Sequence, residues 1–250
     1  MPTFSDSKII TIIGDSLSVS GNATEEKIFY RDMYPFKLQE LLNPLEYYVI
    51  CRSRKGNTVR SQALEDNLKS DLLFTESTYV ILHLGIVDCA PRLFGLMADR
   101  ILTVCMQMRI VKIFAHGLIK FKSKYRRFFT KYFPKTYVSK KDYKEKYLHI
   151  LQKIKTEVKP KKVIIINIAD TSKENKARSF NFEKNIIEYN AILSEVTFAY
   201  PELCQLIDFY SPTKKQKDLI SKDGIHPTKK GHIYLAKLLW DAIKRNEYEL

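Results

Sequence analysis

Apolar and polar positions follow two alternating patterns along this chain. Short, uninterrupted apolar runs are typical of strands that are buried on both faces of a sheet. Segments with an apolar residue every three or four positions are typical of helices that pack one face against a core. The predicted strands are 9–13, 47–52, 78–85, 162–170 and 204–210. The predicted helices are 25–42 (with a break at Pro35), 58–73, 93–129, 140–158, 182–200 and 228–245.

Strands and helices alternate along the whole chain, which predicts an α/β fold with a parallel sheet covered by helices on both faces. The sequence has no G-x-G-x-x-G motif and no Walker loop, which argues against the two commonest nucleotide-binding folds. It also has no internal repeat and no low-complexity linker, so we expect one domain over residues 1–250. Residues 115–141 are basic and aromatic and are interrupted by Pro134. They predict a helical arm inserted between the third and fourth strands, either packed as core or projecting as a lid.

The charge is unevenly distributed. The net charge is +14, and residues 120–155 contain thirteen lysines and arginines against only Asp142 and Glu145. This basic segment is a candidate contact for an anionic membrane surface or an anionic glycan, although a solvated helical face explains the same charge. We do not expect it to bind nucleic acid, because its Tyr and Phe residues recur at helical spacing, which fits packing better than base stacking.

The chain has no apolar run of the roughly 18 residues that a transmembrane helix needs, and its N-terminus lacks the pattern of a signal peptide. The four cysteines, Cys51, Cys89, Cys105 and Cys204, form no C-x-x-C pair. We therefore expect free thiols in a cytoplasmic protein, peripheral to the membrane if residues 120–155 bind it, with no metal and no cofactor. The sequence does not indicate an oligomeric state.

The first predicted strand ends abruptly at Gly14-Asp15-Ser16. These residue types commonly end strands, so a simple turn is one interpretation. The other is that Ser16 is a nucleophile, because ligands of open α/β sheets bind beyond the carboxyl ends of the strands. The second interpretation requires a base and an acid elsewhere in the chain.

A candidate base and acid lie before the last predicted helix, in Asp223-Gly224-Ile225-His226. A carboxylate three residues ahead of an imidazole in a turn can accept a hydrogen bond from one ring nitrogen and leave the other as a base. The alternative is a turn at Asp223 and Gly224 with His226 near a helix cap. We interpret His232, which begins the last helix, as structural.

Together these two motifs resemble those of the SGNH, or GDSL-type, hydrolases, and the resemblance spans nearly the whole chain. It implies a flavodoxin-like three-layer α/β/α sandwich with a five-stranded parallel sheet. It also implies that Ser16 is the nucleophile, His226 the base and Asp223 the acid that orients it. The chemistry of the family is ester hydrolysis, often removal of acetyl groups from carbohydrates.

The resemblance further implies an oxyanion hole made by the backbone N–H groups of Ser16 and Gly56 and by an asparagine amide after the third strand. The chain has Val87 at the asparagine position, in Gly85-Ile86-Val87-Asp88. Loss of one such donor typically costs on the order of 3 kcal/mol of transition-state stabilisation. Either the backbone donors suffice, or Asn57 or Arg92 replaces the amide, or the site no longer hydrolyses esters.

Three polar residues just past strand ends, Asp15, Asp88 and Arg92, are candidate substrate contacts. Arg92 is suited to a carboxylate or phosphate of the substrate; the alternative is an ion pair between Arg92 and Asp88 that braces the loop. Cys89 is a weaker candidate for a second nucleophile, because only His83 is close enough in sequence to activate it.

The leading hypothesis is a serine-dependent ester hydrolase, a deacylase or deacetylase, that acts on a carbohydrate or another polar acyl ester through an acyl-enzyme on Ser16. An acyltransferase would use the same intermediate and a different acceptor. A third hypothesis, motivated by Val87, is a non-hydrolytic binding or scaffold protein in surface polysaccharide biosynthesis.

Overall fold

The predicted strands form one parallel sheet. The computed structural model describes residues 8–19, 26–105 and 111–248. Its strands are β1 (Lys8–Gly14), β2 (Tyr47–Cys51), β3 (Tyr79–His83), β4 (Lys162–Ile166) and β5 (Cys204–Ile207). They lie in the order β2-β1-β3-β4-β5, and every neighbouring pair is parallel. This is the flavodoxin-like order, in which the ligand crevice lies beyond the carboxyl ends of the neighbouring strands β1 and β3, whose following connections lead to opposite faces of the sheet.

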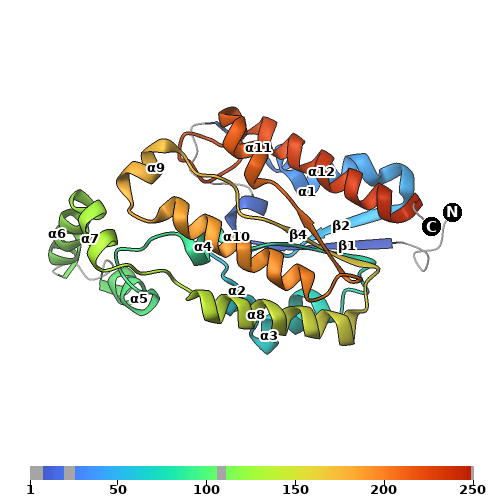
Figure 1. Ribbon diagram of the computed structural model, residues 1–250, viewed down its shortest axis with the longest axis horizontal. Coiled ribbons are helices and arrows are strands. Elements are labelled where there is room, and N and C mark those ends of the chain that lie inside the picture. Colours follow the sequence, from blue (N-terminus) through green and yellow to red (C-terminus); the bar gives the residue numbers. More distant parts are fainter. Residues whose placement is uncertain (1–7, 20–25, 106–110, 249–250) are drawn as a thin grey trace.

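Successive side chains of a strand point to opposite faces of the sheet, so each central strand supplies two separate cores. Ile10 and Ile12 pack with α1 (Tyr34–Leu42) and α12 (Lys229–Tyr248) on one face. Ile13 packs in the core of the other face, which includes residues of α8 (Lys140–Lys153) and α10 (Phe182–Phe198). Figure 1 shows these two pairs of helices on opposite sides of the sheet. The predicted three-layer α/β/α sandwich is therefore confirmed.

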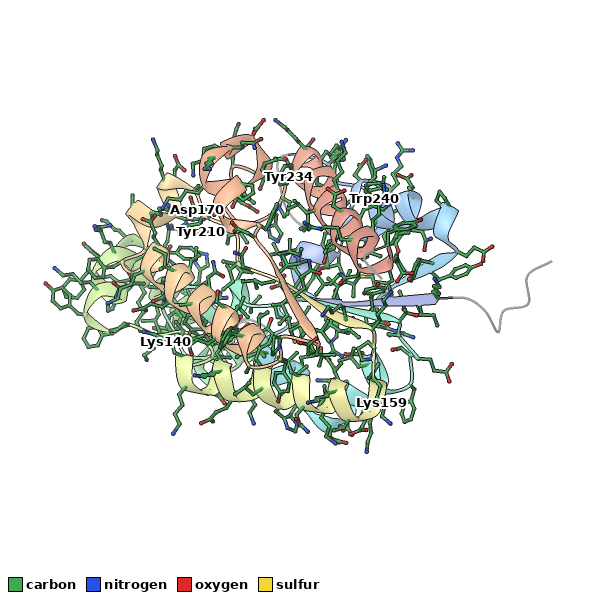
Figure 2. All side chains as sticks on the ribbon, turned by 45° about the vertical axis from the view of Figure 1, so that its right-hand side comes forward. Lys140, Lys159, Asp170, Tyr210, Tyr234 and Trp240 are labelled. Carbon is green, nitrogen blue, oxygen red and sulfur yellow. The ribbon has the colours of Figure 1, made fainter. Side chains whose placement is uncertain are left out.

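The remaining helices are mostly short and lie in the connections. They are α2 (Val59–Gln62), α3 (Glu65–Leu68), α4 (Ile86–Cys89), α5 (Leu96–Cys105), α6 (Val111–Lys124), α7 (Arg126–Tyr132), α9 (Lys173–Arg178) and α11 (Tyr210–Lys215). Short 3₁₀ helices cover Ser16–Ser18, Tyr30–Asp32, Asn43–Leu45 and Lys217–Leu219, and π-helical turns cover Lys69–Leu73 and Ile154–Val158. Figure 2 shows Lys140 and Lys159 at the two ends of α8 and its π-helical extension.

Three predicted helices differ from the structure. The helix predicted over 93–129 is divided into α5, α6 and the start of α7, with a turn at Tyr125 between α6 and α7. The helix predicted over 25–42 begins only at Tyr34, with Pro35 in its first turn, where the missing N–H is not needed. Residues 20–25 lie outside the described part of the chain. The helix predicted over 58–73 is broken at Leu64, whose backbone is extended, and the chain then starts a new turn.

Between α4 and α8 the described residues form three helices, α5, α6 and α7, which gather at one end of the molecule in Figure 1. The predicted arm, 115–141, covers most of α6, all of α7 and the loop that contains Pro134. Large apolar side chains of these helices are exposed, for example Phe114 at 77% and Phe128 at 53%. The outer face of the arm therefore does not pack as core, and its role as a lid stays a prediction. Among the described residues, no helix has both the length and the apolar character needed to cross a bilayer.

Candidate active site

Ser16 lies at the carboxyl end of β1, as the first residue of a 3₁₀ helix. The turn forms because the carboxylate of Asp15 caps it: Asp15 Oδ1 accepts a hydrogen bond from the Leu17 N–H at 2.9 Å. The side chain of Ser16 is partly exposed and lines a pocket of about 360 Å³. The strand end therefore presents a hydroxyl at the predicted crevice.

Asp223 and His226 lie on a closed loop before α12. Ile220 and Pro227 form an antiparallel bridge, and the Ser221 N–H donates to the His226 carbonyl at 2.8 Å. Within this loop, Asp223 Oδ1 accepts hydrogen bonds from Ser221 Oγ and from the N–H groups of Ile225 and His226. Burial acts to raise the pKa of Asp223, but the hydrogen bonds from His226, Ser221 and the backbone outweigh it and hold the pKa well below its ordinary value.

His226 joins the two motifs. Its Nδ1 lies 2.6 Å from Asp223 Oδ2, and its Nε2 lies 3.0 Å from Ser16 Oγ. With the Nδ1 proton donated to the ionised Asp223, Nε2 is left to accept the proton of the Ser16 hydroxyl. The structure therefore brings Ser16, His226 and Asp223 together in the order that a serine nucleophile requires.

Gly224 and Asn175 hold this loop against the connection after β4. Gly224 has φ +73°, and a Cβ there would lie 2.5 Å from side-chain atoms of Asn175 and Ser172, so only glycine fits. Asn175 Nδ2 donates to the Asp223 carbonyl at 2.7 Å, and Thr171 Oγ1 donates to the Gly224 carbonyl at 2.7 Å. These contacts fix the position of the candidate acid and base from outside their own loop.

The connection after β4 is itself braced by a buried ion cluster. Asp170, labelled in Figure 2, is 2% exposed. Its carboxylate lies 2.8 Å from Lys176 Nζ and 2.9 Å from Lys217 Nζ. Burial acts to raise the pKa of Asp170, but the two lysines outweigh it and lower the pKa. The cluster keeps this carboxylate ionised and ties α9 to the loop after α11.

Of the predicted oxyanion-hole residues, Ser16 lines the pocket, whereas Gly56 and Asn57 do not. Val87 lines the pocket together with Ser16, and so does Arg92. Gly56 is exposed at φ +71°, a conformation that favours glycine. The Asn57 side chain is buried, and its amide donates to the Gly14 carbonyl at 3.3 Å and to Gln62 Oε1 at 2.9 Å. Of the two proposed substitutes for the missing asparagine, Arg92 lines the pocket and Asn57 does not.

Asp15 and Asp88, which were predicted as substrate contacts, are placed away from the pocket. Both side chains are 0% exposed, and neither lines the pocket. Asp15 caps the turn at Ser16, and Asp88 Oδ1 accepts from the Val59 N–H at 3.0 Å. Arg92 does not form an ion pair with Asp88 within the described residues; its Nη2 donates to the Val87 carbonyl at 3.0 Å instead. The sequence analysis missed this burial, because a carboxylate just past a strand end is expected to face the crevice.

Cys89 is also excluded as a second nucleophile. Its side chain is 0% exposed, and burial raises the pKa of its thiol far above the ordinary range. His83 and His232 are buried as well, and burial lowers their pKa values to about 3 and about 4. His232 Nδ1 accepts a hydrogen bond from the Tyr34 N–H at 3.3 Å, which agrees with a structural role.

The buried carboxyl of Asp88 predicts a pH-dependent stability. Burial raises its pKa from 3.8 to about 8, so its stabilising contribution is complete below pH 3.8 and is lost as the pH rises toward 8. We expect Asp88→Asn to flatten the fall in the free energy of unfolding over this interval by a few kcal/mol. Urea denaturation of both proteins across the interval measures the difference. Parallel curves would contradict the prediction.

The sequence analysis did not identify Arg126, Asn175 and Arg178 as pocket residues. Asn175 and Arg178 come from α9, and Arg126 comes from α7. No local motif marks them, because their place in the site depends on how the arm and the connection after β4 pack. Only the N-cap Ser172, whose side chain accepts from the Asn175 N–H, signals that a helix begins at this point.

Comparison with known proteins places the chain among related folds. The family model of GDSL-like lipases and acylhydrolases matches residues 12–233. No curated protein matches the chain in sequence. A lipase/acylhydrolase from Enterococcus faecalis has a TM-score of 0.64 and 16% identity, with 95% of each chain covered. An acetylxylan esterase from Geobacillus stearothermophilus has a TM-score of 0.61 and 18% identity, with 94% of each chain covered. At these identities the structural likeness establishes the fold.

Proposed function

Because the chain belongs to the GDSL-like lipase/acylhydrolase family, we propose that it is a serine-dependent ester hydrolase that acts through an acyl-enzyme on Ser16. The observation that carries the proposal is the hydrogen-bonded series Asp223–His226–Ser16, with distances of 2.6 Å and 3.0 Å. The exposure of Ser16 in a pocket at the carboxyl end of β1 supports it further.

In this mechanism Ser16 Oγ attacks the acyl carbonyl while His226 Nε2 takes the hydroxyl proton. The ionised Asp223 stabilises the imidazolium that forms. Collapse of the tetrahedral intermediate breaks the ester bond, and His226 returns the proton to the leaving alcohol. Water then attacks the acyl-enzyme with His226 again as base, which releases the acid and restores Ser16. The low pKa of Asp223 keeps it ionised throughout.

We infer that the substrate is a short acyl ester, such as an acetyl ester, of a carbohydrate or another polar alcohol. The pocket beside Ser16 has a volume of only about 360 Å³, and its lining combines charged and polar side chains with apolar ones such as Val87 and Phe182. The likeness to an acetylxylan esterase covers only the fold. An acyltransferase would share every step up to the acyl-enzyme, and the ratio of transfer to hydrolysis in the presence of added sugar would distinguish the two.

The direct test is hydrolysis of p-nitrophenyl acetate together with labelling by a fluorophosphonate. We expect turnover, and a single labelled peptide that contains Ser16. A protein that neither hydrolyses the ester nor reacts with the fluorophosphonate would contradict the proposal.

Val87 gives a prediction about the oxyanion hole. Val87→Asn adds an amide donor at the position where the family has asparagine, without a large change in side-chain volume. We expect kcat for p-nitrophenyl acetate to rise by about tenfold or more, because one such donor typically contributes 10²–10³. Val87→Ala is the control, because it opens the same space without adding a donor.

If Val87→Asn gives no gain while Ser16 still reacts with the fluorophosphonate, another group supplies the donor or the protein has a different task. Arg92 is then the first residue to test, because it lines the same pocket. The non-hydrolytic binding role gains support only if labelling of Ser16 also fails.

The basic segment 120–155 keeps its role as a candidate contact for an anionic membrane surface or glycan. The arm exposes Phe121, Tyr125, Phe128 and Tyr132, each at least 46% exposed, beside lysines such as Lys122 and Lys131. Exposed aromatic rings beside lysines suit a membrane interface. Sedimentation with vesicles of anionic and of neutral lipid tests this proposal independently of catalysis.

A further inference from the structure

Three arginines line the pocket that contains Ser16. Arg92 follows α4, Arg126 begins α7 on the arm, and Arg178 ends α9. They come from three separate connections, so the fold brings three positive charges to one opening. Of the described residues that line the pocket, Asp223 is the one carboxylate, and its oxygens accept from His226, Ser221 and the backbone.

Each guanidinium is held by neutral groups. Arg92 stacks on the ring of Tyr137, 4.0 Å from its centroid. Arg126 donates from Nε to Ser179 Oγ at 2.6 Å and from Nη2 to the Pro91 carbonyl at 2.7 Å. Arg178 Nη2 donates to Ser123 Oγ at 3.0 Å. These contacts orient the side chains but leave their charges uncompensated.

Within the described residues, none of the three arginines forms an ion pair, whereas Arg54 pairs with Asp71 and Arg60 with Asp142. Arg92 Nε is buried without a hydrogen-bond partner. The pKa of Arg126 is lowered by burial and by the like charges of Arg178 and Arg92. Like charges held together without a counter-charge destabilise the fold, and an anion in the pocket would remove this cost.

We propose that the three arginines form a phosphate subsite, and that the preferred substrate is an acyl ester whose alcohol carries a phosphate group near the ester. This inference rests on the proposed function for the ester and adds the class of its alcohol. Arginine suits this role because its planar guanidinium donates two parallel hydrogen bonds to phosphate oxygens. A doubly charged phosphate complements three convergent guanidinium groups better than a carboxylate does. The alcohol is either a small soluble phosphate or the headgroup of a lipid.

The test compares two esters that differ only in the phosphate: glycerol monoacetate and glycerol 3-phosphate monoacetate. We expect the kcat/KM of the phosphorylated ester to be at least about tenfold higher. In Arg178→Gln this ratio should fall about tenfold, mainly through KM. Arg178→Lys retains the charge and should recover part of the preference. Arg178 is the best choice because, among the described residues, its side chain has a single hydrogen bond, to Ser123.

The matched control is Arg127→Gln. Arg127 lies next to Arg126, donates to the Ala177 carbonyl at 2.7 Å and does not line the pocket. Arg127→Gln tests whether loss of any arginine between the arm and α9 has the same effect. Its ratio of kcat/KM for the two esters should equal that of the unmodified protein. If Arg178→Gln lowers kcat/KM equally for both esters, the arginine only holds the arm in place and the subsite is refuted. A ratio near one in the unmodified protein also refutes it.

A binding measurement separates this inference from the proposed function. Calorimetric titration of the Ser16→Ala protein with glycerol 3-phosphate needs no turnover, and we expect binding that the additional change Arg178→Gln weakens about tenfold. If this binding is observed and the unmodified protein has no esterase activity, the subsite is supported and the proposed hydrolase is contradicted. Absence of binding would refute the subsite alone. Vesicles containing lysophosphatidate then identify the source: faster cleavage than of the soluble ester indicates a lipid headgroup, and slower cleavage a soluble phosphate.

Discussion

Replacing Ser16 with alanine is expected to abolish ester hydrolysis and fluorophosphonate labelling together. Loss of the nucleophile from a complete serine, histidine and aspartate site lowers kcat by about a millionfold, which leaves only the contribution of binding and oxyanion stabilisation. Ser16 Oγ is the hydroxyl oxygen that lies 3.0 Å from His226 Nε2, so its removal takes away the group whose proton this imidazole accepts. Progress curves with p-nitrophenyl acetate and mass spectrometry of the labelled protein measure the two effects.

Ser18→Ala is the matched control for this substitution. Ser18 lies in the same 3₁₀ helix, but its side chain is buried and shares a hydrogen bond of 2.7 Å with the Tyr34 hydroxyl. We expect it to lower stability by about 1 kcal/mol while labelling of Ser16 persists. A Ser16→Ala protein that retains a tenth of the activity would contradict the assigned nucleophile.

Replacing Asp223 with asparagine is expected to lower kcat by about 10⁴. The amide cannot stabilise the imidazolium, and its NH₂ group favours the tautomer of His226 that has its proton on Nε2. The Ser16 hydroxyl then faces a donor in place of a base. Steady-state kinetics with p-nitrophenyl acetate measure the loss, and the rate of fluorophosphonate labelling should fall with it.

Asp218→Asn is the corresponding control, because Asp218 is exposed just before the same loop and pairs with Lys230 at 2.5 Å. It removes a carboxylate of the same region without touching His226, so we expect little change in kcat. If Asp223→Asn keeps most of its activity, the imidazole is oriented by some group other than this carboxylate.

The motifs that lie within a few residues of one another were the part of the site that could be predicted. Gly14-Asp15-Ser16 and Asp223-Gly224-Ile225-His226 are local patterns, so the sequence indicates both the turn and the chemistry. The sheet was equally predictable, because a strand covered on both faces has to be apolar without interruption. That the two motifs meet at one sheet edge follows from the parallel order of the strands.

What the sequence did not reveal depends on packing between distant segments. Arg126 and Arg178 look like surface arginines until α7 and α9 bring them to the same pocket as Ser16. Asp15 and Asp88 look like crevice residues until the fold buries them. The helices α9 and α11 have only six residues each, too few for a helical period to stand out.

Two residues of the candidate site are close together in the sequence, and the third is distant from them. Asp223 and His226 are bonded within one closed loop, whereas Ser16 comes from 210 residues earlier. The acid and base can therefore assemble as soon as their own loop closes, but the hydroxyl becomes a nucleophile only when the first strand and the last loop are both docked. The reactivity of Ser16 therefore reports the final stage of folding. A chain that has formed its sheet but has not yet docked this loop would have an ordinary, unreactive serine.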